Sequence, residues 1–361
     1  MVRALALAEQ ALGQVSPNPA VGAVIVKDGE VVGEGYTRPP GGDHAEIVAL
    51  GQAGERARGG TLYVTLEPCC HYGRTPPCTQ AIIEAGITEV HVATADANPL
   101  VSGGGCRELE AAGIQVHRGA HQAAAQVLNE AYFRFVTAGR PLVTAKFAAS
   151  LDGKIATRQW DSRWISGEPS RARSSHLRRI NDAIMVGNGT LRADDPRLTA
   201  RGPDDKPVNR QPLRVIVGGR GQLPLGARFF GEPGEMLIAL GREALPEERA
   251  ALSRLGVEFI NIPTPEGGVD LAVLIQELAR RNITSLLVEG GSTLLGALFD
   301  GGLVDKVIAF IAPVIIGGAA APTAVAGEGV ARISEALRLA RVSIETLGTD
   351  VMVSGYLGEQ D

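Results

Sequence analysis

One group of residues near the N-terminus restricts what this chain can be more than any other: His44 and Glu46 are followed by Cys69 and Cys78. Histidine and cysteine are common zinc ligands, and three protein ligands leave the fourth position of a tetrahedral zinc open, as in catalytic sites. Zinc lowers the pKa of water bound there towards neutrality. Glu46 is close enough to His44 to lie beside the metal without binding it and to transfer protons. The pattern therefore predicts a hydrolytic zinc site in which His44, Cys69 and Cys78 are the ligands and Glu46 is the general acid and base.

A structural zinc site is the alternative, but such sites normally use four protein ligands. Clustering of cysteines in a long chain also favours metal binding over a disulfide framework. The spacing predicts His44 and Cys78 at helix N-termini, where the partial positive charge favours a thiolate. Cys70 and Cys106, the remaining cysteines, are interpreted as small packing residues.

The length of the chain, 361 residues, predicts two domains, because one hydrophobic core rarely serves so many residues. A net charge of −5 argues against a general polyanion binder, although it does not exclude a local basic patch. No apolar run reaches the length of a membrane span. The N-terminal residues are typical of an amphipathic helix rather than of a signal peptide. We therefore expect a cytoplasmic protein that has no membrane partner.

Short β-rich runs alternate with helical patterns along the whole chain, which predicts an α/β fold. A predicted helix near 121–136 is followed by Gly139-Arg140-Pro141, where we place a domain boundary between residues 1–139 and 140–361. In the first part we expect two strands within 20–36 around the turn pair Asp28-Gly29. The other elements expected there are helices over 44–54, from 76–77 and over 105–113, and strands over 61–68, 89–96 and 114–119.

After the boundary the alternation restarts with a predicted strand over 142–150. The chain end, 338–357, is expected to form an antiparallel strand pair, and 200–212 a polar surface loop. Further core strands are predicted over 182–187, 214–219, 235–240, 257–262 and 284–291.

The zinc pattern resembles the cytidine-deaminase superfamily, whose signature is H-x-E followed by P-C-x-x-C. Here eight residues, CHYGRTPP, separate the two cysteines. The segment PCCHYGRTPPC and the upstream 17–22, PNPAVG, are similar to the pyrimidine deaminases of riboflavin biosynthesis. That resemblance implies that Asn18, His71 and Arg74 contact the substrate. An asparagine suits a pyrimidine edge, and histidine and arginine suit a ribose phosphate. The family commonly has a histidine where this chain has Thr37.

The second half resembles the reductase domain of the same pathway, which has the dihydrofolate-reductase fold. The resemblance rests on 146–157, 161–166, 186–201 and 288–298, and it covers nearly all of 142–358. The expected architecture is therefore an N-terminal cytidine-deaminase-like three-layer domain followed by a C-terminal dihydrofolate-reductase-like domain.

The second resemblance also implies cofactor and substrate contacts. Glu289-Gly290-Gly291 lies between a predicted strand and helix, where glycines let the backbone approach a pyrophosphate; glycine needed only for packing is the alternative. Substrate contacts are implied for Ser162, Arg178, Leu198, Arg201 and Glu289, and the two arginines are interpreted as phosphate ligands rather than as parts of a solvated surface. NADPH contacts are implied for Ala148, Trp164, Thr190, Asp194, Gly291, Ser292, Thr293, Leu294, Leu295, Gly296 and Ala297.

One departure concerns Gly218-Gly219-Arg220, where the family often has Asp-Ser. Gly219 lacks the side chain that would help to hold the cofactor. Arg220 could face the 2′-phosphate of NADPH or be an ordinary exposed loop residue, and the sequence leaves both open.

Together the resemblances imply a bifunctional riboflavin biosynthesis enzyme that uses Zn²⁺ and NADPH. It would deaminate 2,5-diamino-6-ribosylamino-4(3H)-pyrimidinone 5′-phosphate and then reduce the ribosyl side chain to ribityl. We expect a small-molecule substrate, no nucleic acid and a homo-oligomer. A nucleic-acid-editing deaminase is one alternative, and the acidic balance and the reductase half count against it. The other is a fusion in which the C-terminal domain only mediates assembly, against which the many polar matches count.

Overall fold

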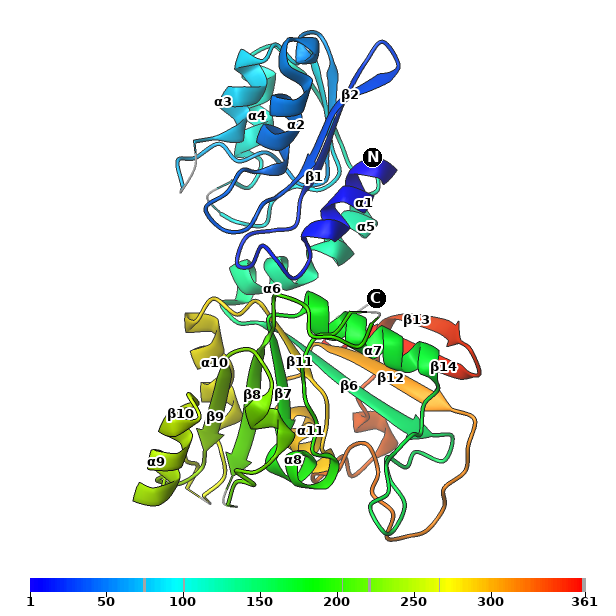
Figure 1. The fold of residues 1–361 in the computed structure, drawn as a ribbon. Coiled ribbons are helices and arrows are strands. Elements are labelled where there is room, and N and C mark those ends of the chain that lie inside the picture. The colour runs from blue at the N-terminus through cyan, green and yellow to red at the C-terminus, as the bar shows by residue number, and fades with distance from the viewer. Residues whose placement is uncertain (74–75, 100, 203, 220–221, 266, 359–361) are drawn as a thin grey trace. The chain divides into compact units, whose positions relative to one another are not determined.

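The computed structural model describes residues 1–361 except 74–75, 100, 203, 220–221, 266 and 359–361. The chain forms two compact units, Met1–Arg140 and Pro141–Asp361. Figure 1 shows an α/β architecture in each of them. No helix in the described part of the chain is both long enough and apolar enough to cross a membrane.

The first unit is built on a five-stranded sheet of order β2-β1-β3-β4-β5. β1 is antiparallel to both of its neighbours, whereas β3, β4 and β5 are parallel. Asp28 and Gly29 join β1 to β2 with φ angles of 51° and 82°, as a two-residue hairpin turn requires. The strands are β1 (Gly22–Lys27), β2 (Glu30–Tyr36), β3 (Thr61–Val64), β4 (Glu89–Val92) and β5 (Gln115–Arg118).

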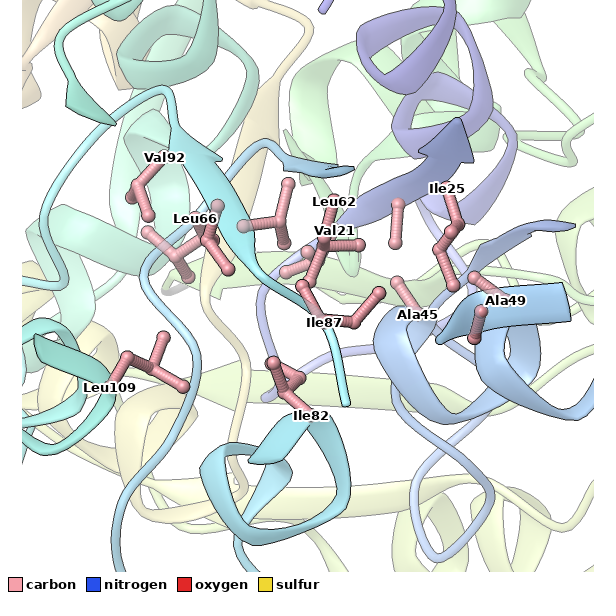
Figure 2. Packing of buried hydrophobic residues seen from close by; sticks show 14 of the residues in the cluster. Val21, Ile25, Ala45, Ala49, Leu62, Leu66, Ile82, Ile87, Val92 and Leu109 are labelled. Carbon is pink, nitrogen blue, oxygen red and sulfur yellow. The ribbon is translucent and has the colours of Figure 1, made fainter. Parts of the chain in front are cut away.

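Helices cover both faces of this sheet and give three layers. α2 (Ala45–Ala53), α3 (Cys78–Glu84) and α4 (Gly104–Ala111) contribute to the core of one face, as Figure 2 shows for Ala45, Ala49, Ile82 and Leu109. α1 (Val2–Ala11) packs on the other face. A short 3₁₀ helix, Gly54–Ala57, follows α2.

Two glycines allow these helices to approach the sheet closely. A β-carbon on Gly22 would lie 1.9 Å from the carbonyl oxygen of Ala4 in α1, and one on Gly33 would lie 2.2 Å from that of Ala49 in α2. Any larger residue would force the layers apart.

The single helix predicted near 121–136 is wrong, because the structure has two, α5 (Gln122–Leu128) and α6 (Glu130–Ala138). Asn129 separates them. Its side chain accepts a hydrogen bond from Ala20 N (2.8 Å) and donates one to Ala20 O (2.9 Å). Asparagine binds backbone groups in this way at helix ends, and here it ties the helix break to the segment before β1.

The second unit is built on a nine-stranded sheet of order β10-β9-β8-β7-β11-β6-β12-β14-β13. The strands from β10 to β12 are parallel, whereas β12, β14 and β13 pair antiparallel. The strands are β6 (Leu142–Ser150), β7 (Ala183–Gly187), β8 (Leu213–Gly219), β9 (Met236–Leu240), β10 (Glu258–Asn261), β11 (Ser285–Val288), β12 (Lys306–Ala312), β13 (Ala340–Leu347) and β14 (Asp350–Tyr356).

Hydrophobic clusters that include helical residues pack against this sheet. The predicted antiparallel pair at the chain end is confirmed as β13 and β14. β10 was expected in the core but is a half-exposed edge strand, and β12 was not predicted. The helices are α7 (Glu168–Ile180), α8 (Asn188–Asp194), α9 (Pro246–Arg254), α10 (Leu271–Arg280) and α11 (Ser292–Asp300), with 3₁₀ turns at Arg228–Gly231 and Ile333–Glu335.

Candidate active sites

The three predicted zinc ligands of the first unit lie together. His44 is the N-cap residue of α2, Cys78 is the first residue of α3, and Cys69 lies in the loop after β3. His44 Nδ1 lies 3.2 Å from Cys78 Sγ and 3.6 Å from Cys69 Sγ. Both ligand-bearing helices begin at the cluster, so their partial positive charges favour thiolates there.

These distances fit a single metal ion. With Zn–N near 2.0 Å and Zn–S near 2.3 Å, ligand atoms around a tetrahedral zinc lie about 3.5–3.8 Å apart. All three ligand atoms lie within 4.8 Å of one another. The set of one imidazole and two sulfurs therefore matches zinc in both chemistry and size.

The thiol groups of Cys69 and Cys78 interact directly. Hydrogen bonding by the Cys78 thiol lowers the pKa of Cys69 to about 4, and the same contact together with burial raises the pKa of Cys78. The backbone N–H of Cys78 also donates to Cys69 Sγ (3.4 Å). Cys106 lies instead in the hydrophobic core, where burial raises the pKa of its thiol to about 11.

Glu46 lies in the first turn of α2 with its side chain buried. Burial, and then the negative charge of Cys69, raise the pKa of Glu46 to about 7, an effect that His44 partly offsets. A carboxyl group with a pKa near neutrality can both accept and return a proton. Its position and its pKa are those that a general acid and base needs.

Two of the residues expected at the pyrimidine substrate lie in loops of the first unit. Asn18 is half-buried in the turn before β1, and His71 follows the cysteine pair. His71 Nδ1 is buried, and no hydrogen-bond partner for it exists among the described residues. Arg74 lies outside the described residues. Thr37 is buried and its hydroxyl accepts a hydrogen bond from Val21 N (3.1 Å), so at this position the chain has a structural contact.

In the second unit, three charged residues from distant parts of the chain meet at the end of β11. Arg178 on α7 donates to Glu289 through Nη2 (2.9 Å), and Lys146 Nζ on β6 lies 3.6 Å from the same carboxylate. Burial alone would raise the pKa of Glu289, but the two cations hold it at about 2. Lys146 was not among the predicted site residues; a charged residue within the predicted strand 142–150 was the available signal.

The glycine turn after Glu289 leads directly into α11. Gly290 and Gly291 have φ angles of 96° and 45°, and a β-carbon on Gly291 would lie 2.9 Å from Thr190 Oγ1. Gly291 and Thr190, both expected to contact NADPH, therefore lie next to each other in the structure. Ser292 and Thr293 begin the helix and Ala297 is exposed. By contrast, the core holds Leu294, Leu295 and Gly296.

A hollow of ≈ 320 Å³ lies near Ser162 and Asp194. The Ser162 hydroxyl donates a hydrogen bond to Asp194 (2.7 Å). Ser162 is an expected substrate contact and Asp194 an expected cofactor contact. Trp164 is 71% exposed, and the Arg171 guanidinium lies over its ring. Ala148 is half-buried on β6.

The remaining expected contacts have structural partners. Leu198 is buried in a hydrophobic cluster of the second unit. Arg201 binds Glu232 Oε2 (3.1 Å) and Thr199 Oγ1 (3.1 Å). Gly219 has a φ angle of 55°, which favours glycine. Arg220, the suggested 2′-phosphate ligand, lies outside the described residues.

Comparisons with known proteins agree along the whole chain. Residues 1–94 match the cytidine and deoxycytidylate deaminase zinc-binding region, and residues 141–353 match the RibD C-terminal domain. The riboflavin biosynthesis protein RibD of Actinobacillus pleuropneumoniae is 41% identical over 98% of this chain and 93% of its own length. The structure of Acinetobacter baumannii RibD, form 1, matches with a TM-score of 0.86 at 36% identity, covering 99% of this chain and 98% of that one.

A Thermotoga maritima structure described as a diaminohydroxyphosphoribosylaminopyrimidine deaminase and 5-amino-6-(5-phosphoribosylamino)uracil reductase is also similar. It matches with a TM-score of 0.84 at 34% identity, over 99% of this chain and 97% of that one. The similarity therefore spans both units.

Proposed function

The chain belongs to the RibD family of bifunctional riboflavin biosynthesis proteins, and from this premise we propose which of its residues perform the two reactions. The family combines a zinc-binding deaminase domain with an NADPH-dependent reductase domain, so the protein is both a hydrolase and an oxidoreductase. We assign the deaminase to residues 1–139 and the reductase to residues 140–361.

For the deaminase, His44, Cys69 and Cys78 would hold zinc, which when bound makes a water molecule nucleophilic near neutral pH. Glu46 would accept the two protons of that water one after the other, and would pass the first to a ring nitrogen and the second to the departing ammonia. The net reaction consumes water and replaces the exocyclic amine by a carbonyl. The observation that carries this proposal is the buried carboxyl group of Glu46 in the first turn of α2, beside three zinc-type ligands.

Substrate recognition is assigned to three loop residues. Asn18 would bind the pyrimidine edge, and His71 and Arg74 the ribose phosphate. The buried Nδ1 of His71 has no partner among the described residues; this supports a polar ligand at this position, because buried polar atoms normally have partners. The proposed substrate is 2,5-diamino-6-ribosylamino-4(3H)-pyrimidinone 5′-phosphate.

For the reductase, NADPH when bound supplies the hydride. Gly291, Ser292 and Thr293 would present backbone N–H groups to its pyrophosphate, beside Thr190. Glu289, held ionised by Arg178 and Lys146, would bind the opening sugar. The other proposed substrate contacts are Ser162, Arg178, Leu198 and Arg201. Ala148, Trp164, Asp194 and the first turns of α11 complete the proposed contacts to NADPH.

The finer properties of the protein are also proposals. A small pyrimidine ribose phosphate, rather than a nucleic acid, is the partner that fits both halves. A cytoplasmic enzyme suits a pyridine-nucleotide cofactor and four free cysteines. A homo-oligomer remains our expectation.

Product analysis by mass spectrometry tests the proposal directly. With the pathway substrate alone, the protein should release ammonia and give the deaminated ribosyl compound. With NADPH added, the ribityl product should appear. Deaminated product that never becomes reduced would favour a reductase half that only mediates assembly, and no deamination at all would refute the first assignment.

A further inference from the structure

Apart from His44, Cys69 and Cys78, another set of metal-type side chains converges in the first unit. Glu89 and His91 lie on β4, and His117 lies on the adjacent strand β5. The Nε2 atoms of both histidines lie 3.0 Å from the same oxygen, Glu89 Oε1. We propose that Glu89, His91 and His117 bind a divalent transition-metal ion such as zinc, at a site separate from the deaminase zinc site.

The two sets lie on opposite faces of the sheet. Val90 and Val92 point into the core beneath α2 and α3, the helices that carry His44 and Cys78. Because successive side chains of a strand point to opposite faces, His91 and Glu89 point away from those helices. An ion bound by them would therefore be independent of the deaminase chemistry.

Neighbouring strands hold the set in position. Tyr63, His91 and His117 are direct partners across β3, β4 and β5. Their rings stack with centroid separations of 4.7 Å and 4.6 Å. The Thr61 hydroxyl donates to Glu89 Oε2 (3.2 Å), which leaves Oε1 for the two imidazoles. Outer partners of this kind orient the ligands of metal sites.

The spacing of the ligand atoms suits a metal ion. Nitrogen and oxygen ligands bound at about 2.0–2.2 Å lie about 2.8–3.1 Å apart at the 90° angles of tetragonal coordination and about 3.3–3.6 Å apart around a tetrahedral ion. The two contacts to Glu89 are 3.0 Å, within a few tenths of an ångström of both ranges. Two imidazoles and one carboxylate suit zinc, nickel and copper ions. His91 is 23% exposed and His117 51%, so an ion has access and the outer imidazole can turn to complete its coordination.

The alternative is an ordinary ion pair, in which the two imidazoles donate to the carboxylate and no metal binds. The two cases differ in a measurable way, because a metal would join β4 to the edge strand β5. Zinc should then raise the unfolding temperature of the protein beyond the effect of the first ion.

The test uses the full chain already loaded with one zinc, titrated with zinc chloride by calorimetry. The wild type should bind one further zinc. Affinity for this ion should fall at least about tenfold in Glu89→Gln, His91→Ala and His117→Ala, and by a similar or smaller factor in Thr61→Val, which removes only an outer partner. His176→Ala, which removes an exposed histidine from α7, is the matched control and should bind as the wild type does.

Cys78→Ser separates this proposal from that for the deaminase, because it should lose the first zinc and keep the second. Unfolding temperatures measured in the presence of a chelator show whether each variant folds. If His117→Ala does not fold, His117→Gln replaces it, because this position is exposed. Absence of a second zinc in the wild type would overturn the proposal. So would a second zinc that persists unchanged in the His91 and His117 variants.

Discussion

The two candidate active sites differ in how the chain assembles them. The zinc-type cluster joins His44, Cys69 and Cys78, which lie within one stretch of α/β structure. The reductase cluster joins Arg178 to Glu289, 111 positions later, and to Lys146 on β6. Local spacing therefore reveals the first site, whereas only the topology of the nine-stranded sheet brings the second together.

The sites also differ in the balance of charge. Beside Cys69, the buried Glu46 has a raised pKa, because burial and a neighbouring anion both oppose its ionisation. The side chain of Glu289 is also largely inaccessible, with 5% exposed, but its pKa is about 2 because two cations compensate its charge. The first arrangement favours a carboxyl group that can exchange a proton, and the second holds a fixed negative charge.

Replacing Glu46 by Gln is the sharpest test of the mobile proton. Deamination should fall by about 10²–10⁴-fold, because the amide cannot accept or return a proton. Zinc content and the reductase rate, measured on pre-deaminated substrate, should be unchanged. Deamination within a few-fold of the wild type would mean that another group moves the proton.

Replacing Glu289 by Gln tests the fixed charge. The change leaves Arg178 and Lys146 without their counter-ion and should destabilise the second unit by about 3 kcal/mol, the low end for a broken buried pair. Glu345→Gln is the matched control, since Glu345 pairs with Arg173 on the same helix at the exposed surface; about 1 kcal/mol or less is expected. Urea unfolding of both variants measures these losses of stability. Equal losses in the two variants would contradict the proposed difference between a buried and an exposed ion pair.

The same residue predicts a pH dependence. The pKa of Glu289 is lowered in the folded protein from 4.5 to about 2, so its contribution to stability is present above pH 4.5 and is lost as the pH falls towards 2. The free-energy difference between wild type and Glu289→Gln should therefore shrink across that window. A constant difference would show that the carboxylate is not ionised in the folded state.

Much of this architecture followed from the sequence, for reasons that particular residues make clear. The hairpin at Asp28-Gly29 and the helix starts at His44 and Cys78 depend on neighbours in sequence, and the structure contains them. The break at Asn129 depends on Ala20, far away in the chain, and local periodicity cannot detect it. The lysine at position 146 is visible in the sequence, but its pairing with Glu289 is not, because the two residues lie on different elements.

Replacing Arg201 by Ala tests a more exposed part of the reductase site. Loss of one charge-assisted phosphate contact should cost about 1.5–3 kcal/mol, seen as a higher KM for the sugar phosphate with unchanged NADPH affinity. Arg197→Ala is the control, because Arg197 also pairs with Glu232 (3.2 Å) but has no proposed substrate contact. If both variants raised KM equally, Arg201 would act only by positioning Glu232.

The smallest expected effect concerns the glycine turn that leads into α11. Gly291→Ala adds a β-carbon 2.9 Å from Thr190 Oγ1 at a φ angle of 45°, which should cost about 1–2 kcal/mol in folding free energy. The same methyl group should crowd the backbone N–H groups proposed to bind the pyrophosphate and weaken NADPH binding by about tenfold, since 1.4 kcal/mol corresponds to a factor of ten. Gly226→Ala is the control, because Gly226 has open space around it and no positive φ. Calorimetric titration with NADPH separates the two effects: weaker stability with normal NADPH affinity would mean that this turn serves packing alone, and that the cofactor phosphates bind at another edge of the sheet.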